Sequence, residues 1–66
     1  MTLDDAIAHL SAYLTADDAR GLRGRVASLH TDRLRWHMVA LASIDAAARG
    51  CDVTAVRAAH TTAVAD

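Results

Sequence analysis

The sequence predicts an all-α fold, a small domain of three or four helices built around one long central helix. Its apolar residues recur mainly at spacings of three and four, the period of a helix, and no segment alternates as a half-buried strand does. Two copies of the pattern Thr-x-Asp-Asp-Ala, thirteen residues apart, have the form of helix starts. With 66 residues, no proline and three glycines, the chain has room for one helical domain, residues 1–66.

The first helix is predicted at about residues 3–14. Thr2 is its N-cap, and Asp5 three residues later completes an acidic version of the capping box. Four apolar residues then follow at spacings of four, three and four, which places them on one helix face: Leu3, Ile7, Leu10 and Leu14.

The second helix is predicted to begin after Thr15, where the same cap pattern returns. Its apolar stripe is formed by Leu22, Val26 and Leu29. Two glycines weaken its first turns, because each costs about 1 kcal/mol relative to alanine inside a helix. Near Thr31 the sequence allows two outcomes: a new helix begins there, or the second helix continues into the central one.

The central helix is predicted to run from Asp32 to Arg49. Gly50 follows it as a C′ residue with a positive φ, because a helix must end there before the next one begins. Asp52 is the expected cap of a last short helix, at about residues 53–64.

The central helix is apolar on two faces. One face carries the larger residues Leu34, His37, Leu41, Ile44 and Ala48, and we expect it to pack within the domain. The second face carries Trp36, Val39, Ala40, Ser43 and Ala47. Because so small a domain covers two faces poorly, we expect the second face to be a partner interface. In the competing arrangement, the second helix folds back over Trp36.

The cations are concentrated in the middle of the chain. Residues 1–19 contain four Asp and no Arg, whereas residues 20–35 contain five Arg and one Asp. Possible contacts to an anion or to nucleic acid are Arg20, Arg23, Arg25 and Arg57. We expect instead that at least one of the first three pairs with Asp17, Asp18 or an acidic residue of the first helix.

Residues 40–64 also resemble a helix-turn-helix. Ala46, Gly50 and Val56 occupy the positions of its small residue, turn glycine and second-helix apolar residue. Asp45 and Arg49 stand where apolar residues are usual. The second helix offers Arg57 as its only cation, although DNA affinity depends mainly on phosphate contacts.

The sequence contains no pattern typical of an active site. His30 and His37 are seven residues apart, about 10.5 Å along a helix, which is too far for a shared metal. Cys51 precedes a helix and has His60 as its nearest candidate base, but no phosphate loop or paired acid accompanies them. We therefore expect no enzyme activity, cofactor, metal or small-molecule substrate.

These observations lead to one expectation about function and one alternative. We expect a small non-catalytic assembly or adaptor protein that acts through helix-mediated contacts and self-associates as a homo-oligomer, or else binds another helical protein. The alternative is a dimeric helix-turn-helix regulator; nucleic acid is possible but not favoured. An acidic N-terminus, a single cysteine and a longest apolar run of nine residues predict a cytoplasmic protein without membrane contact.

Overall fold

Residues 1–65 form four helices, and the all-α prediction is confirmed. A computed structural model describes residues 1–65, and it contains no strand in that part of the chain. The helices are α1 (Leu3–Ser11), α2 (Ala16–Ser28), α3 (Asp32–Ala48) and α4 (Thr54–Val64). The longest of them, α3, is the predicted central helix, and it contacts each of the other three.

Threonine caps begin the first three helices. In each case the threonine Oγ1 accepts a hydrogen bond from the backbone N–H three residues later, at 3.1 Å for Thr2, 3.1 Å for Thr15 and 3.2 Å for Thr31. The cap at Thr31 decides the question that the sequence left open, since the chain begins a new helix there. Hydrogen bonds with the hydroxyl and backbone N–H of Thr2 lower the pKa of Asp5, which completes the first capping box.

Helix α1 ends three residues earlier than predicted. After Ser11 the chain continues in i→i+3 bonds, from Tyr13 N to the Leu10 carbonyl at 2.9 Å and from Leu14 N to the Ser11 carbonyl at 3.3 Å. The reason is the next cap: Thr15 must be extended, with φ −66° and ψ 159°, to begin α2. The first helix therefore unwinds before it.

Helix α3 ends in the turn that the sequence predicted. Gly50 has φ +96°, and within residues 1–65 it is the only residue with a positive φ. The backbone N–H of Cys51 bonds to the Ala46 carbonyl, and that of Gly50 to the Ala47 carbonyl, both at 3.0 Å. This pair of bonds is a Schellman motif, which needs a left-handed residue at the position of Gly50.

Replacing Gly50 with valine is expected to lower the free energy of unfolding by more than about 1 kcal/mol, because a β-branched residue is strained at this φ. Gly24→Ala is the matched control. A Cβ at Gly24 meets nothing within 4 Å and lies inside α2, so this change should stabilise by about 0.5–1 kcal/mol. Urea denaturation followed by circular dichroism measures both. Equal effects of the two variants would contradict the role assigned to the turn.

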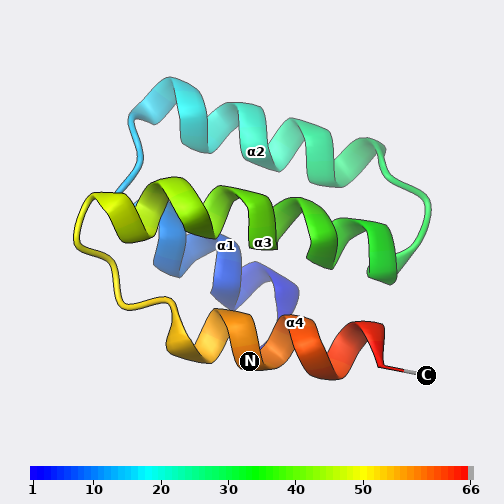
Figure 1. The fold of residues 1–66 in the computed structure, drawn as a ribbon. Helices are drawn as coiled ribbons and strands as arrows, with labels where there is room; N and C mark the ends of the chain where they lie inside the picture. Colours follow the sequence, from blue (N-terminus) through cyan, green and yellow to red (C-terminus); the bar gives the residue numbers. More distant parts are fainter. Residues whose placement is uncertain (66) are drawn as a thin grey trace.

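Three helices lie side by side in one layer, and the fourth lies behind them. Figure 1 shows α2, α3 and α4 next to one another, with α1 behind α3. Each helix contributes one large, almost completely buried side chain to the common core: Leu10, Leu22, Val39 and Val56. The core therefore lies between α1 and the inner side of the three-helix layer.

The orientation of α3 corrects the prediction about its two faces. Trp36, Val39 and Ser43 point inward and are buried, with 7%, 0% and 3% of their surface exposed. The hydroxyl of Ser43 donates to the Ala40 carbonyl at 2.6 Å, so its burial leaves no unpaired donor. Leu41 and Ile44, which were expected in the core, are 63% and 68% exposed. With a single helix behind the layer, one side of α3 stays uncovered.

Candidate functional site

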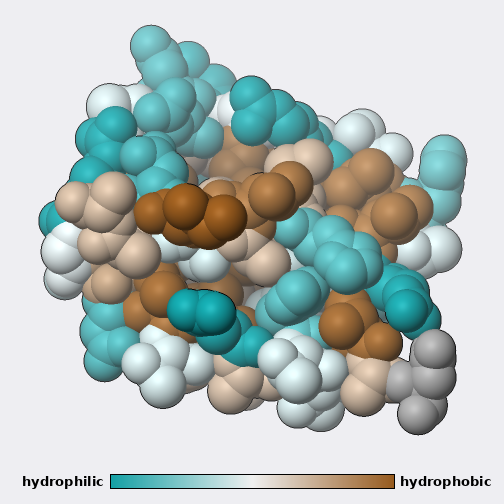
Figure 2. Space-filling view, viewed as in Figure 1, coloured by the Kyte–Doolittle hydropathy of each residue, from teal (hydrophilic) through white to brown (hydrophobic). Residues whose placement is uncertain are grey.

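The uncovered side of α3 is the candidate site. The outer face of α3 consists of five residues at helical spacing, all exposed: Leu34, His37, Leu41, Ile44 and Ala48. Figure 2 shows hydrophobic residues in a band along this helix, bordered by hydrophilic ones. Because surface leucines and isoleucines are common singly, the significant feature is their alignment on one helix between two grooves.

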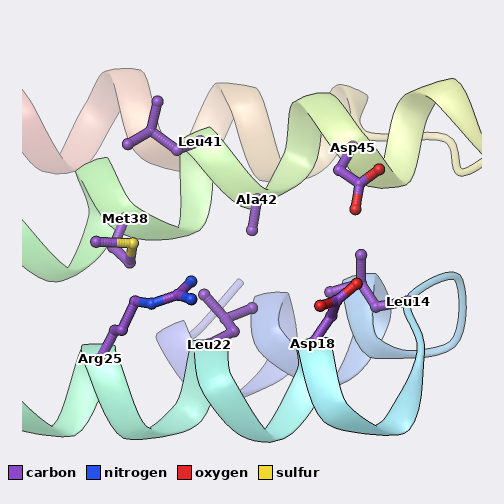
Figure 3. Close-up of a pocket in the computed structure, with 8 residues that line it drawn as sticks. All are labelled: Leu14, Asp18, Leu22, Arg25, Met38, Leu41, Ala42 and Asp45. Atoms are coloured by element: carbon purple, nitrogen blue, oxygen red, sulfur yellow. The ribbon is translucent and has the colours of Figure 1, made fainter.

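The first groove lies between α2 and α3. The α2–α3 groove has an apolar floor and charged rims, and its lining residues are Leu14, Asp18, Leu22, Arg25, Met38, Leu41, Ala42 and Asp45. Figure 3 shows Asp18 and Asp45 facing each other at one end, with Arg25 beside Met38 toward the other end. The groove is therefore acidic at one end and basic at the other.

The second groove lies between α3 and α4, and none of its lining residues within residues 1–65 is acidic. Its sides include Ala40, Ile44, Val53, Arg57 and His60. His60 Nε2 lies 3.0 Å from His37 Nδ1, close enough for one imidazole to donate a hydrogen bond to the other. The two rings meet edge to face, with centroids 5.0 Å apart. This pair joins the outer face of α3 to α4.

The residues predicted as a partner interface are divided between the core and this second groove. Trp36, Val39 and Ser43 belong to the core, so the prediction that they form an exposed surface is wrong for the folded chain. Ala40 is half-buried and Ala47 is exposed, and both line the α3–α4 groove. Trp36 shares the core cluster with Leu22 and Val26 of α2, and it also borders a depression formed with Met1 and α4.

The four arginines proposed to contact an anion do not share one surface. Arg20 pairs with Asp17 at 3.3 Å, which confirms the predicted pairing, and Arg23 donates to Ser11 Oγ at 3.5 Å. Arg23 lines a depression between α1 and α2, whereas Arg25 lines the α2–α3 groove. Arg57 lies on α4, beyond α3. Arg23, Arg25 and Arg57 therefore line three different depressions.

The predicted helix–glycine–helix corner is present, but its helices are not arranged as in a helix-turn-helix. Figure 1 shows α3 and α4 side by side and running in opposite directions, whereas the DNA-binding motif crosses its helices at about 90–120°. Asp52 is not the N-cap that the sequence predicted, because α4 begins after Val53, which makes no side-chain cap bond; Asp52 Oδ1 instead accepts from Thr54 N at 3.0 Å across the corner. Hydrogen bonds from the backbone N–H and hydroxyl of Thr54 lower the pKa of Asp52.

Cys51 is a core residue rather than an exposed nucleophile. Its side chain is 6% exposed, and burial raises the pKa of the thiol, with a smaller contribution from the charge of Asp52. The nearby carbonyl of Asp52 also accepts a 2.6 Å hydrogen bond from His9 Nε2, which ties the corner to α1. Burial and a raised pKa both oppose formation of a reactive thiolate.

Sequence reasoning missed the His37–His60 contact, because the two residues are 23 positions apart and on different helices. The sequence allowed His37 to be compared only with His30, its neighbour on the same stretch of chain. Among residues 1–65, no three His, Cys or Asp side chains gather as a metal site would require. Within the same range, none of the helices combines the length and apolar character needed to cross a bilayer.

Fold and site together define a class: a small four-helix domain with an uncovered apolar face on its central helix. Comparisons with protein-family models, with curated proteins and with solved structures find no match to this chain.

Proposed function

We propose that this chain is a non-catalytic assembly or adaptor protein of the cytoplasm that binds protein partners through the outer face of α3. The observation that carries the proposal is the exposure of Leu41 and Ile44, at 63% and 68%, on the central helix of the domain. The partner class is a helical protein, either a second copy or another chain, because ridges and grooves of one helix layer fit those of another.

Burial of this face provides the driving force for binding. Fully burying a Leu or Ile side chain is worth about 1.5–3 kcal/mol, so covering what remains exposed of Leu41 and Ile44 yields roughly 1–2 kcal/mol each. Leu34, 46% exposed, extends the same line by two turns. In a domain of this size such gains are comparable with the whole free energy of folding, about 3–5 kcal/mol.

The DNA-binding alternative draws on fewer observations. Its supporting feature is the corner at Gly50, which also serves an ordinary pair of adjacent antiparallel helices. Its proposed cations diverge over three surfaces, and one of them, Arg20, is paired with Asp17. Since DNA affinity grows with the number of phosphates neutralised, one cation on α4 gives little.

A photo-crosslinking experiment tests the proposal without assuming a partner. A benzophenone amino acid at Ile44 should give discrete protein adducts in host cells, because this position lies in the proposed contact. The same group at Ala58 is the control, since Ala58 is exposed on α4 and borders the depression near Trp36 instead. Protease-sensitive adducts from position 44 alone support the proposal. No adducts, equal adducts from both positions, or nuclease-sensitive adducts would overturn it.

A further inference from the structure

We infer that the partner of this face is a second copy of the same chain, bound across the α2–α3 groove in a two-fold arrangement with antiparallel α3 helices. The inference rests on the proposed function and adds the identity and orientation of the partner. Its basis is the distribution of charge around the groove, which is complementary to itself.

The two ends of the groove carry opposite charges without partners. Asp45 is already paired with Arg49 at 3.2 Å, but neither the Asp18 carboxylate nor the Arg25 guanidinium forms an ion pair with any residue in the part of the chain that the structure describes. Both are exposed and line the same groove, and Figure 3 shows them toward its opposite ends. A partner that presents a positive group at the Asp18 end and a negative group at the Arg25 end therefore complements the groove.

A second copy meets this requirement by symmetry. In a two-fold interface each patch contacts its equivalent, so residue i of one copy meets residue j of the other, and j meets i. A two-fold axis that crosses the middle of the groove, perpendicular to the helices, makes α3 of the second copy antiparallel to α3 of the first. It brings Asp18 of each copy near Arg25 of the other, so the dimer contains two equivalent contacts between opposite charges.

The apolar residues of the groove lie where this axis would pass. Leu22 and Ala42 line the groove between the charged ends, whereas Leu41, also a lining residue, projects from the outer face of α3 toward the Arg25 end. The contact would cover the exposed parts of Leu41 in both copies at once.

Charge exchange between two variants tests this arrangement. Asp18→Arg alone should place two arginines opposite each other at both ends, and Arg25→Asp alone should place two aspartates there. Each variant is expected to weaken self-association at least tenfold relative to the unmodified chain, measured by sedimentation at low salt. An equimolar mixture should recover the dimer as a mixed species, detectable by native mass spectrometry, because each mixed pair restores both opposite-charge contacts.

Asp17→Arg and Arg20→Asp are the matched controls. They change the same charges on the same helix, but these residues pair with each other and do not line the groove, so the dimer should be unaffected. Circular dichroism of each variant confirms that it is folded.

Two results would overturn the inference in different ways. If the unmodified chain keeps a mass of 7.0 kDa at 500 μM while position 44 still crosslinks to another protein, the partner is not a second copy and the proposed function stands. If the chain dimerises but the mixture of variants does not recover the dimer, the antiparallel arrangement over this groove is wrong.

Discussion

Trp36→Ala is expected to lower the free energy of unfolding by about 3–5 kcal/mol, the usual cost of removing a large buried aromatic side chain. Trp36 is 7% exposed and belongs to the core cluster with residues of all four helices. Because a domain of 66 residues is stable by only about 3–5 kcal/mol, most of the variant should be unfolded at 25 °C. Circular dichroism in a urea titration measures the change.

Leu41→Ala and Ile44→Ala are the controls on the same helix. Both residues are mostly exposed in the single chain, so each change should alter the free energy of unfolding by no more than about 0.5 kcal/mol. The titration is made near 1 μM, where association contributes least. If Leu41→Ala costs as much as Trp36→Ala at this concentration, the assignment of the inner and outer faces of α3 is wrong.

The thiol of Cys51 is expected to react with iodoacetamide at least about 100-fold more slowly in the folded chain than in 6 M urea. The side chain is buried and its pKa is raised by burial, so labelling requires an opening of the structure. With a free energy of unfolding of about 3–5 kcal/mol, the open population is below about one per cent. Mass spectrometry of samples quenched at successive times gives the two rates.

A relocated thiol calibrates this measurement. In a Cys51→Ala background, Ala58→Cys places a thiol on the exposed side of α4, where it should react at nearly the same rate in the folded and unfolded chain. Fast labelling of Cys51 in the folded chain, close to the rate at Ala58→Cys, would show an accessible thiolate. Such a result would restore Cys51 as a candidate nucleophile.

Several helix ends could be predicted from the sequence because local chemistry determines them, although the end of α1 and the start of α3 could not. A threonine N-cap needs only the backbone N–H three residues later, and Thr2 and Thr15 both make that bond. Gly50 has the positive φ that its position after Arg49 required. The pairing of Arg20 with Asp17 is equally local, since three residues on a helix bring the two side chains together. Interactions within one turn depend little on the rest of the fold.

The sequence does not predict which face of α3 points toward the core. A helix that is apolar on both sides has no periodicity that distinguishes inside from outside, so the larger Leu41 and Ile44 appeared to be the better core residues. The packing of α1 behind the three-helix layer decided instead that Trp36, Val39 and Ser43 lie inside. The His37–His60 contact likewise depends on how α3 and α4 pack together.

What the sequence by itself determined is therefore the class of the fold, the threonine caps at Thr2 and Thr15 and the turn at Gly50. What only the tertiary structure decided is the position of the candidate site, including the charged ends of the α2–α3 groove at Asp18 and Arg25. The physical reason is the range of the interactions involved. Caps and turns are fixed by neighbours three or four residues away, whereas a surface is defined by which helices pack together, and that depends on contacts along the whole chain.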